Sequence, residues 1–338
     1  MNNSQRLAIE KFVAKAASAQ KALIVNMKIL NGGAVQENWL TTLSIEGGQW
    51  EGTMECVLRC DSETAGVNIS HGRPEEFELL RTVFAAGVTV PEPLWLCDDS
   101  SLIGRKFFLM RCIKGIASGH ILVKDMTYAP DRVQLAERLG VELATIHAIT
   151  RHTSRIDFLE TYDDSPANHL IRQHRAYLDS HPQDHPVLEW AIRWLERHAP
   201  QTDLVTLIHG DFRTGNYMVD DQGLTGILDW EFAAWGDPLQ DIGWFCAKCW
   251  RFGKVKSEAG GIGSRADFIN GYERQSGRKI DKSLVAYWEV MAHVRWAVIA
   301  LEQAERFRGA EAPSLLLALT GHMVPELEWE ILKLTENN

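Results

Sequence analysis

The sequence predicts a two-lobed α+β protein, with an N-terminal antiparallel sheet interrupted by one helix and a mainly helical C-terminal lobe. Three features of the 338 residues favour this fold class. Short β-type runs alternate with glycine turns in the first third, one segment among them has clear helix start and stop signals, and long segments of helical period follow. The expected lobes are residues 1–112 and 113–338.

The first third consists mainly of predicted strands. Residues 1–20 come first and show an amphipathic helical pattern, without the continuous apolar core of a signal peptide. Runs rich in Val, Ile, Leu and Thr then predict strands over Ala22–Leu30, Asn38–Ile45 and Met54–Arg59. Because glycine pairs separate these runs, a small antiparallel sheet is expected.

One helix is expected over Arg73–Ala85, since Pro74 stands near its start and Gly87 follows its end. Strands resume at Pro93–Cys97 and Lys106–Cys112.

Beyond residue 115 the pattern becomes helical. Helices are predicted over Asp131–Ile149, His169–Ser180, Val187–Arg197, Asp241–Trp250 and Leu284–Phe307, with β-type runs at Leu204–Ile208, Tyr217–Asp220 and Gly226–Leu228. The polar stretch Lys254–Arg265 is expected to be a mobile surface loop, because it has few apolar residues to bury.

Composition limits the partners. With 45 acidic and 35 basic residues the net charge is −10, which disfavours nucleic acid. Charged residues interrupt the most apolar segment, Trp288–Leu301, so no membrane span is predicted and a cytoplasmic location is expected. The six dispersed cysteines do not suggest a disulfide framework. Nothing in the sequence indicates an oligomeric state.

The strongest chemical signal is the motif His-Gly-Asp-Phe-Arg-Thr-Gly-Asn at residues 209–216, followed by Leu-Asp-Trp-Glu at residues 228–231. Phosphoryl transfer needs a carboxylate near the acceptor hydroxyl and hard oxygen ligands for Mg²⁺. Asp211, Asn216 and Asp229 supply these groups in the order in which kinases use them. An isolated Asp in a loop would merely cap a turn, but the fixed spacing favours catalysis.

Here the chain resembles the aminoglycoside phosphotransferase/choline kinase-like superfamily, whose fold is protein-kinase-like. The subgroup it looks closest to is similar to the kinase-like part of acyl-CoA dehydrogenase fusion proteins. The resemblance implies that Asp211 is the catalytic base or orienting carboxylate, that Asn216 and Asp229 hold Mg²⁺, and that Asp241 is structural and bonds back to the catalytic loop.

The N-terminal lobe carries the expected nucleotide-binding residues. Gly32 and Gly33 resemble the loop that covers the phosphates of ATP, although a simple hairpin turn is the alternative. Arg59 stands where most kinases have a phosphate-binding Lys, and Glu76 matches its partner on the following helix. A surface arginine is the alternative for Arg59. Met110 lies on the strand that resembles the adenine-binding hinge.

The resulting prediction is an ATP- and Mg²⁺-dependent phosphotransferase acting on a hydroxyl of a small molecule. A pseudokinase that binds nucleotide without turnover is the alternative, although all three core polar residues are present. A true protein kinase is disfavoured because the His-Arg-Asp, Asp-Phe-Gly and Ala-Pro-Glu signatures are missing.

Other features receive simpler interpretations. Cys246 and Cys249 are expected to be neutral and buried, and the cluster His181, Asp184 and His185 to be solvated, rather than metal sites. Most of the 12 tryptophans should be core residues, while those just after Asp229 could face a cationic or planar acceptor.

Overall fold

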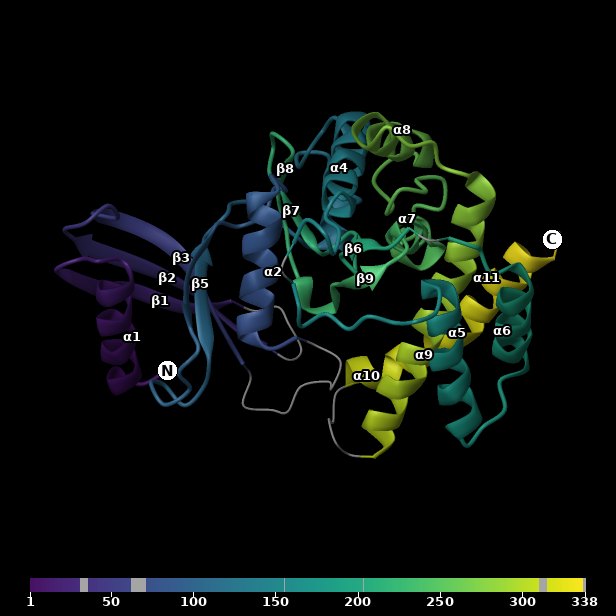
Figure 1. Ribbon diagram of the computed structural model, residues 1–338, viewed down its shortest axis with the longest axis horizontal. Coiled ribbons are helices and arrows are strands. Elements are labelled where there is room, and N and C mark those ends of the chain that lie inside the picture. The colour runs from purple at the N-terminus through teal and green to yellow at the C-terminus, as the bar shows by residue number, and fades with distance from the viewer. Residues whose placement is uncertain (31–35, 62–70, 155, 203, 310–314, 337–338) are drawn as a thin grey trace. The chain divides into compact units, whose positions relative to one another are not determined.

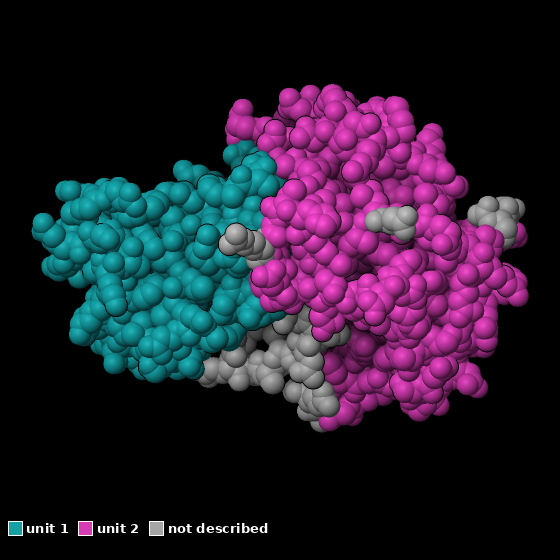
Figure 2. Space-filling model, in the orientation of Figure 1, with its two compact units in different colours: residues 1–116, 217–220, 224–233 teal, residues 117–216, 221–223, 234–338 magenta. Residues whose placement is uncertain are grey.

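The structure is a computed structural model that describes residues 1–30, 36–61, 71–154, 156–202, 204–309 and 315–336. The chain forms two compact units, coloured separately in Figure 2. Unit 1 comprises residues 1–116, 217–220 and 224–233, and unit 2 comprises residues 117–216, 221–223 and 234–338. These units follow packing rather than chain order, and the lobe boundary between residues 112 and 113 stays a prediction.

Unit 1 is built on a five-stranded antiparallel sheet with the strand order β1-β2-β3-β5-β4 (Figure 1). Its strands are β1 (Lys21–Leu30), β2 (Gln36–Glu46), β3 (Gly52–Asp61), β4 (Pro93–Cys97) and β5 (Phe107–Arg111). Strand β5 lies between β3 and β4, with Leu58 of β3 opposite Leu109 of β5. Both side chains are fully buried, so this pair belongs to the core of the sheet.

Two helices accompany the sheet. Helix α1 (Asn3–Ala16) begins with a capping box, in which Asn2 and Gln5 exchange side-chain hydrogen bonds with each other's backbone, and it buries Ile9 and Val13. Helix α2 (Arg73–Ala85) has Pro74 in its first turn, and Gly87 follows it with φ of 86°. This left-handed backbone suits glycine and ends the helix.

A short hairpin from later in the chain completes unit 1. It consists of β7 (Tyr217–Val219), β8 (Leu224–Ile227) and the 3₁₀ turn η1 (Trp230–Phe232). The backbones of Ile116 and Val219 exchange two hydrogen bonds, which fix the hairpin to the end of the first segment.

Unit 2 is mainly helical. Its helices are α3 (Gly119–Leu122), α4 (Arg132–His147), α5 (Pro166–Ser180), α6 (Pro186–His198), α7 (Pro238–Cys246), α8 (Arg265–Ser276), α9 (Lys282–Arg308), α10 (Leu315–Thr320) and α11 (Val324–Thr335), with 3₁₀ turns η2 (Lys248–Trp250) and η3 (Gly321–Met323). Strands β6 (Thr206–Ile208) and β9 (Ala234–Gly236) pair antiparallel beside them. The predicted α+β fold, with an N-terminal antiparallel sheet and a mainly helical C-terminal part, is therefore confirmed.

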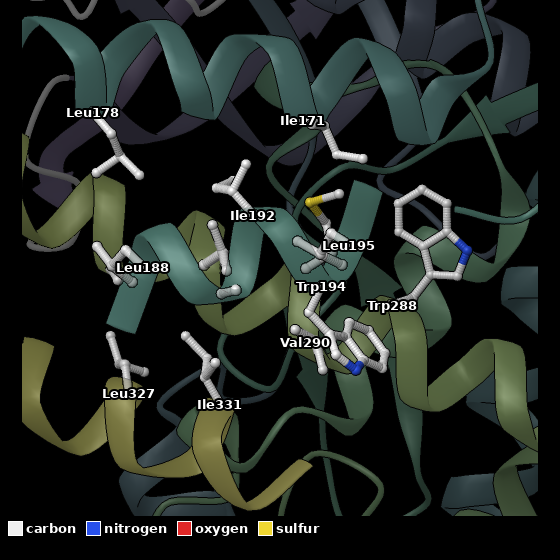
Figure 3. Packing of buried hydrophobic residues seen from close by; sticks show 14 of the residues in the cluster. Ile171, Leu178, Leu188, Ile192, Trp194, Leu195, Trp288, Val290, Leu327 and Ile331 are labelled. Carbon is white, nitrogen blue, oxygen red and sulfur yellow. The ribbon is translucent and has the colours of Figure 1, made fainter. Parts of the chain in front are cut away.

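One core of unit 2 lies among α5, α6, α9 and α11, whose apolar side chains meet in Figure 3. It includes Ile171, Leu188, Ile192, Leu195, Trp288, Val290, Leu327 and Ile331. Helix α9 is long and apolar enough to cross a membrane by length and composition alone, and the prediction of no membrane span stays untested. However, 72% of its most apolar window is buried inside the protein, as expected for a core helix.

The stretch Lys254–Arg265, predicted to be a mobile surface loop, is exposed at residues 254–256 but not over its whole length. Residues 259–262 are buried, and the carbonyl of Gly260 accepts a 2.6 Å hydrogen bond from the Thr214 hydroxyl. On α9, Glu289 forms ion pairs with Arg251, which precedes the stretch, and with Arg265 at its end. Long-range polar contacts thus order a segment that has few apolar residues.

The prediction that the cluster of His181, Asp184 and His185 is solvated is also wrong in part. The side chain of His181 has no exposed surface, and its Nε2 lies 3.1 Å from the Glu305 carboxylate of α9. The linker between α5 and α6 is therefore packed on its inner side, which local sequence could not reveal.

Candidate active site

The His-Gly-Asp motif lies in a loop of unit 2 that follows β6. Gly210 has φ of 77°, a left-handed conformation that a residue with a Cβ adopts at a cost. The carboxylate of Asp241, on α7, accepts hydrogen bonds from the backbone N–H groups of His209 at 2.7 Å and Gly210 at 2.9 Å. The predicted structural role of Asp241 is thereby confirmed.

A buried network keeps Asp241 charged. The Nε2 of His147 lies 3.2 Å from Asp241 Oδ2, and its Nδ1 lies 3.0 Å from the hydroxyl of Tyr272. Burial alone would raise the pKa of Asp241, but the hydrogen bond and charge of His147 outweigh it and hold that pKa below its ordinary value. An ionised Asp241 accepts the loop amides more strongly than a neutral one.

Asp211 lies at the centre of four side-chain hydrogen bonds. Its Oδ1 accepts from Trp244 Nε1 at 2.8 Å and from Arg213 Nε at 3.1 Å. Its Oδ2 accepts from Asn216 Nδ2 at 2.5 Å and from Arg213 Nε at 3.2 Å. The carboxylate is therefore held in one orientation while its side chain stays 13% exposed.

Asn216 is oriented by the same contacts. Its amide nitrogen donates both to the Asp211 carboxylate and, at 3.0 Å, to the Asp211 carbonyl. Since the nitrogen faces Asp211, the amide oxygen is turned away from it and is the atom that can accept a hard cation.

The predicted cation of the third strand lies in unit 1. Arg59 is only 5% exposed, so the surface alternative for it is wrong. Its Nε lies 2.7 Å from Glu76 Oε1 and its Nη2 lies 3.2 Å from Asp229 Oδ1. Burial lowers the pKa of Arg59, but the charges of Glu76 and Asp229 outweigh it and raise that pKa.

A second buried arginine, Arg73, was not predicted from the sequence to take part in this site. It forms ion pairs with Glu76 on the same helix and with Asp61 at 3.0 Å. Glu76 is therefore shared between Arg59 and Arg73. The spacing of three residues between Arg73 and Glu76 on α2 was the one local signal for this pair.

Asp229 adopts a left-handed backbone, with φ of 61° and ψ of 67°. A non-glycine residue in this conformation is strained, and such strain concentrates at functional sites. Its side chain is 40% exposed, so a carboxylate oxygen remains accessible beside the Arg59 contact. Burial, reinforced by the Asp229 charge, raises the pKa of the neighbouring Glu231.

The structure describes only one of the remaining residues that were predicted to bind the nucleotide. Met110 lies on β5, opposite Val57 of β3 and Pro93 of β4. Gly32 and Gly33 lie outside the described residues. Asp211 and Asn216 belong to unit 2, whereas Arg59, Glu76, Asp229 and Met110 belong to unit 1. The roles of all these residues stay predictions.

Arginine side chains lie over two of the tryptophan rings near Asp211. The guanidinium of Arg213 lies 4.6 Å from the ring centre of Trp250, and that of Arg295 lies 4.5 Å from Trp244. One face of each indole is thus covered, which limits the predicted use of these rings for a cationic acceptor. Within the described ranges, no group of three or more His, Cys, Asp or Glu side chains is placed to hold a metal.

The chain resembles known proteins in sequence. It is 30% identical over 198 residues to acyl-CoA dehydrogenase family member 10 of Mus musculus, covering 57% of this chain and 18% of that protein. It is 28% identical over 252 residues to family member 11 of Homo sapiens, covering 70% and 31%. The chain therefore spans less than a third of these relatives' length.

Solved structures share the fold. A protein of Ralstonia eutropha provisionally called an aminoglycoside phosphotransferase superposes with a TM-score of 0.76 at 20% identity, covering 98% of both chains. Aminoglycoside phosphotransferase APH(4)-Ia, in complex with ADP and hygromycin B, gives 0.63 at 15% identity and covers 98% of this chain and all of its own. A macrolide 2′-phosphotransferase of Brachybacterium faecium gives 0.59 at 18%, covering 94% and 97%.

The match to a family extends through the candidate site. Residues 69–278, more than half of the chain, match the phosphotransferase enzyme family. This range contains the loop of the His-Gly-Asp motif, the β7–β8 hairpin and the Asp241 contacts. The chain belongs to the phosphotransferase enzyme family.

Proposed function

We propose that this protein transfers the γ-phosphate of ATP to a hydroxyl group of a small molecule. The observation that carries the proposal is the fixed carboxylate of Asp211, which four hydrogen bonds hold on a loop anchored by Asp241. A carboxylate held in this way can accept the proton of an acceptor hydroxyl and orient its oxygen for attack. Family membership and the fold of small-molecule phosphotransferases support the same chemistry.

The donor groups fit a nucleotide with Mg²⁺. Asn216 turns an amide oxygen away from Asp211, and Asp229 keeps an exposed carboxylate oxygen, so both offer the hard ligands that Mg²⁺ prefers. When bound, the metal would neutralise charge on the phosphates. Arg59 is held by Glu76 and would pair with phosphate oxygens, while the backbone of Met110 on β5 would receive the adenine.

A screen for the acceptor tests the proposal. Purified protein with ATP and Mg²⁺ is assayed for ADP release against aminoglycosides, amino alcohols, sugars and hydroxyacyl thioesters. A parallel assay with GTP as the donor measures GDP release. At least one hydroxyl compound should stimulate ADP release, and the Asp211→Asn variant should lower that stimulated rate at least about 100-fold. Tight MgATP binding without turnover on any class would instead support the nucleotide-binding pseudokinase.

A further inference from the structure

We propose that Trp244 is a positioning residue for Asp211, held in place by neighbouring tryptophan and arginine side chains in unit 2. The inference rests on the proposed function, because it assigns how the reacting carboxylate is aimed. Its starting point is the 2.8 Å hydrogen bond from Trp244 Nε1 to Asp211 Oδ1. An indole N–H can only donate, so this contact favours an ionised acceptor in one orientation.

The indole itself has little freedom to move. Trp244 is 3% exposed on α7 and packs with Ala247, Trp250 and Ala292 in a small cluster. The rings of Trp244 and Trp250 lie 5.0 Å apart with 53° between their planes. Its N–H therefore comes from a packed helix rather than from the catalytic loop.

Two arginines link this cluster back to the loop. Arg213 lies over Trp250 and donates from Nε to both oxygens of Asp211. Arg295 lies over Trp244 and donates from Nη1 to the Gly210 carbonyl at 2.6 Å. Each arginine thus stacks on an indole and bonds to the loop, so loop and cluster hold each other at Gly210 and Asp211.

The two carboxylate oxygens are fixed from different elements. Trp244 of α7 holds Oδ1, whereas Asn216 of the loop holds Oδ2. Loss of the indole donor leaves Oδ1 with Arg213, which bridges both oxygens and so controls rotation of the carboxylate less well. Small misplacements of a reacting group lower rates by about 10- to 100-fold.

Trp244→Phe removes the N–H donor and keeps an aromatic ring on α7. With an acceptor from the screen, we expect kcat to fall about 10- to 100-fold while the KM for MgATP changes less than about twofold. Trp288→Phe is the matched control, because Trp288 is 1% exposed in the same unit and its indole N–H makes no hydrogen bond to any described residue. It should retain wild-type kcat, and melting temperatures show whether both variants fold.

A double-mutant cycle separates positioning from general packing. In an Asp211→Asn background, Trp244→Phe should lower the residual rate little further, because the carboxylate that it aims is gone. Equal kcat losses for Trp244→Phe and Trp288→Phe, or losses for Trp244→Phe and Asp211→Asn that simply multiply, would overturn the positioning role.

Nuclear magnetic resonance tests the contact without turnover. In ¹⁵N-tryptophan-labelled protein, the indole N–H signal that disappears in Trp244→Phe is assigned to Trp244. In Asp211→Ala that signal should shift upfield more than any other indole signal, because its carboxylate acceptor is lost. Turnover combined with an unmoved Trp244 signal refutes this inference alone, whereas a wild type without turnover on any acceptor refutes the proposed function.

Discussion

At the scale of single residues, the main chemical feature of unit 1 is a carboxylate shared by two buried arginines. Glu76 faces Arg59 and Arg73, while Arg59 also faces Asp229 and Arg73 also faces Asp61. Buried charges are stable only when paired, so removal of Glu76 leaves two cations short of a partner. Removal of Arg59 still leaves Glu76 with Arg73, which makes the arginine the better residue to vary.

Arg59→Ala should raise the KM for ATP about tenfold or more and lower turnover, because a guanidinium fork that can hold phosphate oxygens is lost. Arg59→Lys should restore only part of the loss, since an ammonium is a single point charge. Arg81→Ala serves as the control, because its side chain is 60% exposed on α2 and its ion pair with Glu78 lies on the surface. ATP kinetics at saturating acceptor measure these effects, and an Arg59→Ala enzyme with wild-type KM for ATP would exclude phosphate binding by this residue.

At the scale of elements, the buried carboxyl group of Asp237 at the start of α7 lowers the stability of the fold when it is ionised at neutral pH. Asp237 caps the helix by accepting a 2.8 Å hydrogen bond from the Leu239 N–H. Burial raises the pKa of Asp237 to about 6, and the hydrogen bond only partly offsets this. Because its pKa is higher in the folded than in the unfolded state, folding binds protons, and stability falls as the pH rises from about 4 to about 6.

Asp237→Asn keeps an oxygen acceptor for the cap but does not titrate. Relative to wild type, the variant should gain about 2–3 kcal/mol of unfolding free energy between pH 4 and pH 7, which corresponds to a pKa difference of about two units. Urea denaturation of both proteins at the two pH values measures the gain. Parallel pH dependence in the two proteins would show that Asp237 does not titrate differently on folding.

One residue of α9, Glu289, supports the ordering of the Lys254–Arg265 stretch together with the Thr214–Gly260 hydrogen bond. Glu289 is 3% exposed, and its Oε2 lies 2.7 Å from Arg265 Nη1 while its Oε1 lies 3.3 Å from Arg251 Nη2. Glu289→Ala should lower the unfolding free energy by about 3–5 kcal/mol, because two largely buried cations lose their partner. In Glu258→Ala, the loss should be at most about 1 kcal/mol, since that side chain is 44% exposed and lies 3.4 Å from Arg265. Equal losses in urea denaturation would contradict this account.

At the scale of the whole molecule, local sequence signals predicted the helices and strands better than they predicted the contacts between them. Helix α2 begins and ends as predicted because Pro74 and Gly87 act within a few residues of its ends. The pairing of Asp241 with the catalytic loop was predicted through a family resemblance, not from periodicity. The acceptor pocket was beyond prediction, because pocket shape depends on segments with little local pattern.

Apart from the pair of Arg73 and Glu76 on α2, the contacts that were missed join residues distant in sequence. Trp244 reaches Asp211 across 33 positions, and Arg265 reaches Glu289 across 24. Such pairs leave no trace in hydrophobic period or turn chemistry, so Lys254–Arg265 was expected to move freely. Partners of this kind become visible only when the chain is folded.

The most direct test of the central claim measures MgATP binding by calorimetry to wild type, Asp211→Asn and Asp229→Asn, alongside turnover. Wild type should bind one MgATP, and Asp211→Asn should bind within about threefold of wild type while turnover falls at least about 100-fold, because a positioned carboxylate acts mainly in the transition state. Asp229→Asn should weaken binding about tenfold or more, because a charged ligand for the metal is lost. Absence of MgATP binding to wild type, or equal loss of binding in both variants, would contradict the account.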